Sequence, residues 1–277
     1  MRSVKLPSGN SMPVFGLGTW RMGEHPDQRQ SETDAIRAAL DIGVTLIDTA
    51  EMYGEGGAEK VIGNAIQGRR DGLFLVSKVY PHNASRNGVV EACERSLARM
   101  KVDCIDLYLL HWPGNYPLSE TFSAFHLLQD SGKIGDFGVS NFDIDKLREI
   151  PLEDQALLGC NQVFYNLAQR QPEYAVTKWC RQQGVPIMAY SPLDQASSLL
   201  ASPAISDVAA RHSVSNAQIA LAWLLHQPDT LVIPKSVRPG RIRENFAAVD
   251  IMLSQQDLAD LDKAYPAPLG PVRLGMR

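Results

Sequence analysis

The chain has 277 residues, 44% of them hydrophobic, and 27 Lys and Arg residues against 31 Asp and Glu residues give a net charge of −4. This mild acidity argues against nucleic acid or an anionic membrane surface as the main partner. The length fits either two ordinary domains or one large α/β barrel. The opening "MRSVKLPSGN" has no apolar signal core, and no stretch approaches about 18 consecutive apolar residues, so we expect a cytoplasmic protein outside membranes.

The four cysteines are spread along the chain and form no CxxC motif: Cys93, Cys104, Cys160 and Cys180. This spacing indicates neither a zinc site nor a redox motif. Because no cluster of His, Cys, Asp or Glu has ligand spacing, we expect no metal.

The predicted elements begin with a hairpin, "VKLPSGNSMPV", which turns at Ser8-Gly9-Asn10. Short apolar runs bounded by turn residues follow, and each is too continuous for a strand with one face in water. We predict strands at residues 15–20, 44–48, 73–78, 104–111, 133–141, 158–166, 185–192 and 230–236.

Helical patterns separate these strands. Two segments carry apolar side chains at helical spacing, namely Ala58, Val61, Ile62, Ala65 and Ile66, and then Val90, Cys93, Leu97 and Met100. Ser215 and Gln218 have capping-box spacing, and Gly43 and Gly132 stand where helices should end. The gap between the last two predicted strands has room for two helices.

Regular alternation of strand and helix predicts stacked βα units and a parallel sheet. No Pro/Ser/Gly-rich linker divides the chain, so we predict one (β/α)8 TIM barrel domain over residues 1–277. The hairpin should cap the barrel floor, with extra helices near the C-terminus. A Rossmann fold is disfavoured because "YGEGGAE" lacks GxGxxG and follows a polar loop.

Polar residues occupy the predicted carboxyl ends of the strands, which in such barrels point at the active site. They are Asp48, Lys78, His111, Ser140, Asn141, Gln162, Tyr190 and Lys235, with Tyr53 in the loop after Asp48. Plainer explanations exist for single residues: Asp48 could cap a turn and Lys78 could lie on the surface. His111 could be a structural histidine, and Tyr53 an ordinary loop aromatic. Their gathering on one barrel face favours a catalytic site.

Together these residues suit general acid catalysis. A lysine amine inside the barrel needs a counterion, and Asp48 on the neighbouring strand can supply it for Lys78. An ammonium beside Tyr53 should lower the phenol's pKa from its ordinary value of about 10. Tyr53 would then protonate a developing alkoxide, a contribution of about 10²–10⁴-fold. His111, as a neutral donor, would hold the substrate carbonyl against that hydroxyl.

A second signal is the cationic stretch "VIPKSVRPGRIREN" at residues 232–245, which follows the last predicted strand. Its cations are Lys235, Arg238, Arg241 and Arg243. Barrels often bind phosphate at this place. A run of cations more commonly forms only a solvent-exposed basic face. Ser236 among the cations and the position beyond a strand end favour a phosphate site.

At these residues the chain resembles the aldo-keto reductase family over nearly its whole length. The motifs that carry the resemblance are "IDTAEMYG", "LVSKVY", "YLLHWP", "GVSNF", "NQVFYN", "AYSPL" and "IPKS…RIREN". The resemblance implies a (β/α)8 barrel that binds NADPH or NADP across its mouth. It also implies a catalytic tetrad of Asp48, Tyr53, Lys78 and His111, with Tyr53 as the acid.

The resemblance further implies a set of cofactor contacts and a substrate pocket. The nicotinamide end would be held by Ser140, Asn141, Gln162 and the ring of Tyr190. The pyrophosphate would lie along Ser191 and Leu193. The adenosine 2′-phosphate would be gripped by Lys235, Ser236 and Arg241, joined by Arg238, with Glu244 and Asn245 at the adenine. The aromatic walls of the substrate pocket would be Trp20, Tyr80 and Trp112.

Departures from the aldose-reductase pattern direct the expected substrate. Val44-Thr45 replaces the Tyr and Arg usual in that group, "GEGGAEKVIG" is a longer stretch, and the loop after His111 and the tail are short. The chain therefore resembles a bacterial branch that includes methylglyoxal reductases. We expect a monomer that reduces small aldehydes and α-keto aldehydes with NADPH, and whose partner is a small carbonyl substrate.

Three alternatives remain open from the sequence. One is a diketo-sugar or aldose reductase of the same family. Another is a lyase that forms a Schiff base on Lys78, although such a lysine needs a depressed pKa and Asp48 would do the opposite. The third is a cofactor-holding binding protein, as in potassium-channel β-subunits.

Overall fold

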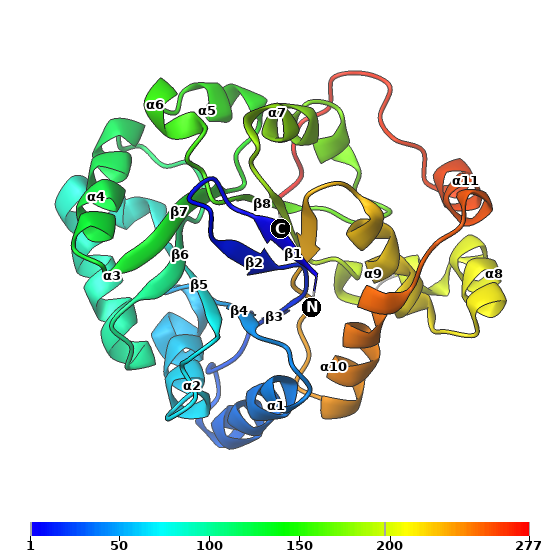
Figure 1. Cartoon of the computed structure of the whole chain (residues 1–277), viewed down its shortest axis with the longest axis horizontal. Coiled ribbons are helices and arrows are strands. Elements are labelled where there is room, and N and C mark those ends of the chain that lie inside the picture. The colour runs from blue at the N-terminus through cyan, green and yellow to red at the C-terminus, as the bar shows by residue number, and fades with distance from the viewer. Residues whose placement is uncertain (1, 197, 277) are drawn as a thin grey trace.

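A ring of parallel strands enclosed by helices makes up the computed structural model, which describes residues 2–196 and 198–276 (Figure 1). The barrel strands are β3 (Gly16–Gly18), β4 (Leu46–Asp48), β5 (Phe74–Val79), β6 (Ile105–Leu110), β7 (Ile134–Ser140), β8 (Asn161–Phe164), β9 (Ile187–Tyr190) and β10 (Thr230–Val232). Consecutive strands pair in parallel, and a parallel bridge between Phe15 and Val232 joins the two ends of the sheet. The predicted (β/α)8 barrel is confirmed, and each predicted strand contains the observed one except that β5 extends to Val79.

The predicted N-terminal hairpin is also confirmed. Strands β1 (Ser3–Lys5) and β2 (Ser11–Pro13) pair antiparallel, and Gly9 adopts a φ of 90° in the turn between them. The side chain of Asn10 donates a hydrogen bond of 2.9 Å to Asp136 on β7. The hairpin therefore lies across one end of the barrel, in front of the strands in Figure 1.

Helices surround the strands on the outside. The α-helices are α1 (Arg29–Asp41), α2 (Gly57–Ala65), α3 (Arg86–Met100), α4 (Leu118–Asp130), α5 (Ile144–Arg148), α6 (Leu152–Gln155), α7 (Val176–Gln183), α8 (Pro203–His212), α9 (Asn216–His226), α10 (Pro239–Phe246) and α11 (Gln255–Ala264). Short 3₁₀ helices are η1 (Pro26–Gln28), η2 (Tyr53–Gly56), η3 (Pro81–Asn83), η4 (Gln171–Glu173), η5 (Asp194–Ala196), η6 (Ser198–Ala201) and η7 (Ala247–Asp250). The two helices expected between the last barrel strands are α8 and α9.

The sequence patterns predicted most of the inward helix faces. All five apolar residues of the first pattern, from Ala58 to Ile66, are buried, whereas in the second pattern Val90 is half-buried and Val89 takes the inward place. Ser215 and Gln218 form the predicted capping box at the start of α9. Gly43 and Gly132 follow α1 and α4 with positive φ values.

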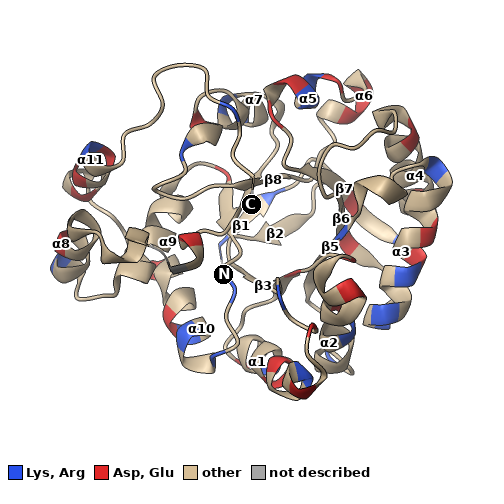
Figure 2. Cartoon of the chain, turned by 180° about the vertical axis from the view of Figure 1, so that it is seen from behind, with Lys and Arg blue, Asp and Glu red and all other residues tan. Residues whose placement is uncertain are grey.

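Both signs of charge lie mainly on the outer helices and loops (Figure 2). The four cysteines are free, and three of them are buried. Within the described ranges, every helix is too short or too polar to cross a lipid bilayer.

Candidate active site

A cavity of ≈ 1060 Å³ opens at the carboxyl ends of the barrel strands. Asp48, Tyr53 and His111 lie at one part of its wall, and Lys235 and Arg241 line it as well. Because the cavity gathers residues from most strand ends, the parallel register of the barrel is what brings together side chains that lie far apart in sequence.

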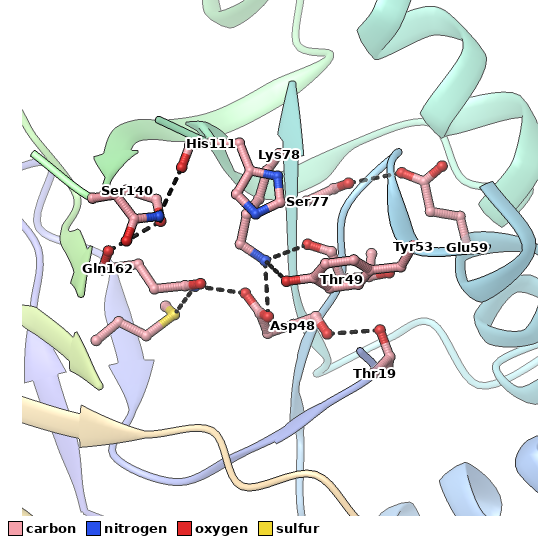
Figure 3. A network of polar contacts seen from close by, with 12 residues as sticks. Thr19, Asp48, Thr49, Tyr53, Glu59, Ser77, Lys78, His111, Ser140 and Gln162 are labelled. Atoms are coloured by element: carbon pink, nitrogen blue, oxygen red, sulfur yellow. Dashed lines mark hydrogen bonds and ion pairs between the residues drawn. The ribbon is translucent and has the colours of Figure 1, made fainter. Parts of the chain in front are cut away.

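Lys78 is at the centre of a polar network below this cavity (Figure 3). Its side chain is fully buried, and its Nζ donates hydrogen bonds to Asp48 Oδ2 at 2.9 Å, to the Thr49 carbonyl at 2.7 Å and to Tyr53 Oη at 3.3 Å. Strands β4 and β5 are neighbours, so the predicted counterion contact follows directly from the barrel order. All three N–H groups of the ammonium are therefore paired.

Tyr53 begins η2, where Gly54 and Gly56 adopt positive φ values and turn the loop back toward the barrel mouth. The Nζ of Lys78 lies 4.9 Å from the centre of the Tyr53 ring. Burial nevertheless raises the pKa of Tyr53 above its ordinary value, because it outweighs the lowering by the charge of Lys78, and Asp48 adds to the rise. The expectation of a net lowered pKa is therefore wrong, since the sequence did not reveal that desolvation of the phenol would outweigh the charge of Lys78.

Two further pKa shifts fix the charges around the phenol. Burial lowers the pKa of Lys78, but its contacts with Asp48 and Tyr53 together raise it more, so the amine stays an ammonium. Burial and then the charge of Lys78 hold the pKa of His111 well below its ordinary value, which makes this ring neutral as expected. Within the described part of the chain, Nδ1 of His111 is buried without a hydrogen-bond partner.

The residues expected around a nicotinamide come together beside the network. Ser140 Oγ donates to the Gln162 carbonyl at 3.0 Å, and Tyr190 Oη lies 2.9 Å from Asn141 Oδ1. The ring of Phe164 stacks on Tyr190 with centroids 5.6 Å apart. This arrangement fixes an aromatic face and several amide and hydroxyl groups on the cavity wall.

The expected phosphate end is assembled except for one residue. The side chains that line the cavity there, and along the expected pyrophosphate path, are Ser191, Leu193, Lys235, Ser236, Arg241, Glu244 and Asn245. Arg238 does not line it: this residue is exposed at the start of α10, and its backbone N–H donates to Ser236 Oγ at 3.1 Å.

The aromatic walls also differ in one place from the expectation. Trp20 and Trp112 line the cavity, whereas Tyr80 does not, and its ring packs against that of Trp112 with centroids 5.4 Å apart and nearly perpendicular planes. The backbone N–H of Tyr80 donates to Glu51 Oε1 at 2.8 Å. Tyr80 therefore supports the wall rather than forming its surface.

Several lining residues were missed from the sequence: Arg21, Met52, Gln195, Leu200, Ser215, Asn216, Ala217 and Met276. Arg21 follows the first barrel strand, with its guanidinium 4.4 Å from the Trp20 ring, and the strand-end rule applied there would have found it. Met276 belongs to the C-terminal tail. A hydrogen bond of 3.0 Å from the Leu274 N–H to Asp143 Oδ2 holds this tail against the barrel. No local pattern in the tail predicts this contact.

Comparison with known proteins agrees with the barrel fold. The family model described as "Aldo/keto reductase family" matches residues 14–266. The chain is 46% identical to methylglyoxal reductase YeaE of Escherichia coli, covering 99% of each, and 36% identical to glyoxal reductase of Bacillus subtilis, covering 94% of this chain and 91% of that protein. The crystal structure of an aldo-keto reductase from Klebsiella pneumoniae in complex with NADPH has a TM-score of 0.95 to this fold and 44% identity, covering 100% of this chain and 99% of that one.

Proposed function

Because this chain belongs to the aldo/keto reductase family, we propose that it is an NADPH-dependent reductase of small aldehydes and α-keto aldehydes, with methylglyoxal-type substrates. The observation that carries the proposal is the contact of 3.3 Å between the Lys78 ammonium and the Tyr53 hydroxyl at the cavity wall. A phenol held beside a buried cation is suited to protonate a carbonyl oxygen on which negative charge develops.

The cavity residues fit a nicotinamide dinucleotide. Its volume of ≈ 1060 Å³ lies just above the range of about 300–1,000 Å³ for small-molecule sites, as suits a dinucleotide with a small substrate. Ser140, Asn141 and Gln162 present hydroxyl and amide groups suited to a carboxamide, and Lys235 and Arg241 present cations suited to a phosphate. When bound, NADPH supplies the hydride that reduces the carbonyl carbon.

The protein's own part in the reaction is the proton. Tyr53 donates its hydroxyl proton to the carbonyl oxygen as the carbon gains hydride, so that an aldehyde becomes an alcohol. The raised pKa of Tyr53 keeps the phenol protonated at neutral pH. An alkoxide is a stronger base than a phenolate, so the transfer remains downhill, and Lys78 stabilises the phenolate that results.

His111 orients the carbonyl. Its low pKa makes it a neutral ring with one N–H, and its Nδ1 has no acceptor among the described residues. The N–H is therefore best placed on Nε2, where it can donate to the substrate oxygen. Its ring centroid lies 5.8 Å from that of Tyr53, so the two donors can converge on one oxygen.

Small substrates are favoured by the shape of the site. Residues 111–117 alone separate β6 from α4, and Trp20 and Trp112 bound the cavity. Larger ligands would need a longer loop or tail to enclose them. The similarity to proteins named methylglyoxal reductase and glyoxal reductase supports α-keto aldehydes over sugars.

We extend the proposal to the protein's setting: a single domain over residues 1–277 that works as a monomer in the cytoplasm, without nucleic acid. The net charge of −4 and the free cysteines support this setting. Light scattering on the purified chain should give a mass near 30.5 kDa, and twice that mass would contradict the monomer.

The test is NADPH consumption with methylglyoxal, phenylglyoxal, glyceraldehyde and a diketo sugar. We expect the highest kcat/KM with the two α-keto aldehydes. A preference for the diketo sugar or glyceraldehyde would instead support the sugar-reductase alternative.

Borohydride treatment with substrate should leave no adduct on Lys78, because the raised pKa of this lysine disfavours its action as a Schiff-base nucleophile. An adduct there would support the lyase.

A further inference from the structure

Gln162 makes a contact that a role in cofactor binding does not require. Its Nε2 lies 2.7 Å from Asp48 Oδ1, while the other carboxylate oxygen of Asp48 accepts from Lys78 (Figure 3). Gln162 stands on β8 and Asp48 on β4, which are four strands apart in the sheet order. The bond therefore crosses the interior of the barrel, and both side chains are buried.

The orientation of the Gln162 amide follows from the charge of its neighbour. A carboxylate oxygen at 2.7 Å accepts hydrogen bonds, so the nitrogen rather than the oxygen of the amide must face Asp48. Gln162 also lines the cavity, and among the described residues no donor is recorded to its Oε1. The backbone carbonyl of Gln162 accepts from Ser140 Oγ and from the Asn141 N–H.

We propose that Gln162 is a positioning residue that couples the seating of the nicotinamide carboxamide to the acid strength of Tyr53. The coupling runs along one continuous chain of hydrogen bonds through Gln162, Asp48, Lys78 and Tyr53. This inference rests on the proposed function. It joins the group that positions the hydride donor to the group that supplies the proton.

The sign of the coupling follows from the charges that face Tyr53. These are the ammonium of Lys78 and the carboxylate of Asp48, whereas His111 is neutral and burial keeps the Cys160 thiol neutral near Asp48. The Asp48 charge opposes ionisation of the phenol, and the N–H of Gln162 offsets part of that charge. A hydrogen bond accepted at Oε1 polarises the amide and strengthens its N–H as a donor. Binding of the nicotinamide carboxamide should therefore make Tyr53 a stronger acid than it is in the protein without cofactor.

The first experiment measures binding rather than turnover. NADPH affinity is determined by protein-fluorescence quenching for the wild type, Gln162→Met, Asp48→Asn and the double variant. We expect Gln162→Met to weaken NADPH in the wild-type background but much less when Asp48 is already Asn, with a coupling factor of about fivefold, the equivalent of one hydrogen bond. Additive effects would overturn the proposal.

Ser140→Ala is the matched control. Ser140 lines the same cavity and touches the backbone of Gln162, but it makes no recorded contact with Asp48. Its effect on NADPH affinity should be independent of Asp48→Asn. Equal coupling for Ser140→Ala and Gln162→Met would mean that Asp48→Asn disturbs the whole wall, and it would overturn the specific role of Gln162.

The second experiment follows the pH profile of kcat with methylglyoxal. Gln162→Met should lower kcat near pH 7 and move the alkaline limb upward, because the Asp48 charge is less offset and Tyr53 becomes a weaker acid. Ser140→Ala should leave the alkaline limb of the kcat profile in place, and an unmoved alkaline limb in Gln162→Met would overturn the proposal.

If Gln162→Met does not fold, Gln162→Leu can replace it, because leucine also lacks the amide. A wild-type protein that binds NADPH but reduces no carbonyl would contradict the proposed function without contradicting the coupling, because the coupling is measured from the NADPH affinities of the four proteins.

Discussion

The ammonium nitrogen of Lys78 lies 3.3 Å from the hydroxyl oxygen of Tyr53, inside the barrel and beneath the cavity. Burial favours the neutral phenol, and the cation favours the phenolate. The two influences serve different moments of the reaction, because the phenol must be protonated before proton transfer and stabilised as an anion after it. Burial therefore keeps the acid protonated before the transfer, and the contact with Lys78 lowers the energy of the phenolate after it.

Replacing Lys78 by Met should damage both catalysis and stability. We expect kcat to fall by about 10²-fold or more, because the phenolate loses its cation. The free energy of unfolding should fall by about 3–5 kcal/mol, because Asp48 is left buried without its ionic partner. Steady-state kinetics and denaturant unfolding measure the two effects. Adding Asp48→Asn should restore much of the stability but not kcat, and a double variant as unstable as Lys78→Met would contradict the pairing.

Replacing Arg241 by Ala should weaken NADPH far more than NADH. Arg241 lines the cavity at the expected 2′-phosphate position, and the loss of a charge-assisted hydrogen bond is worth about 10- to 100-fold in affinity. Fluorescence titration with the two cofactors measures the difference. Arg238→Ala is the control, since the exposed Arg238 does not line the cavity and its replacement should change NADPH affinity by less than about twofold. Equal losses of NADPH and NADH in Arg241→Ala would argue against a 2′-phosphate clamp.

His111 should make the fold sensitive to mild acid. Its pKa in the folded protein is well below its ordinary value, so the unfolded chain binds a proton below about pH 6.5 that the folded chain does not. Stability contributed by the neutral ring is therefore fully present above that pH and is lost as pH falls toward the folded pKa, by at most about 1.4 kcal/mol per pH unit. Denaturant unfolding of wild type and His111→Asn between pH 7 and pH 5 measures it. Parallel pH dependence in the two proteins would show that His111 is not buried neutral.

The strand ends were the part of the site most accessible from the sequence. A parallel barrel sends residues at the ends of its strands to one mouth, so the positions of Asp48, Lys78 and His111 followed from the order of short apolar runs. Tyr53 was found because its loop directly follows Asp48. Their mutual contacts are as expected, with Lys78 paired to Asp48 and touching Tyr53.

What the sequence could not supply depends on contacts made across the fold. The net pKa shift of Tyr53 is set by burial, which many distant residues produce together. The bond from Gln162 to Asp48 joins strands on opposite sides of the barrel, and Met276 reaches the cavity only because the tail folds back. Four nearby cations look alike in a sequence, and only the fold shows that Arg241 lines the cavity whereas Arg238 does not.

The most direct measurement is the rate at which Tyr53→Phe oxidises NADPH with methylglyoxal, beside its NADPH affinity. Phe keeps the ring and removes the hydroxyl proton, so kcat should fall by about 10²–10⁴-fold. The NADPH affinity should stay close to that of the wild type. A Tyr53→Phe protein that turns over as fast as the wild type would show that the proton comes from elsewhere.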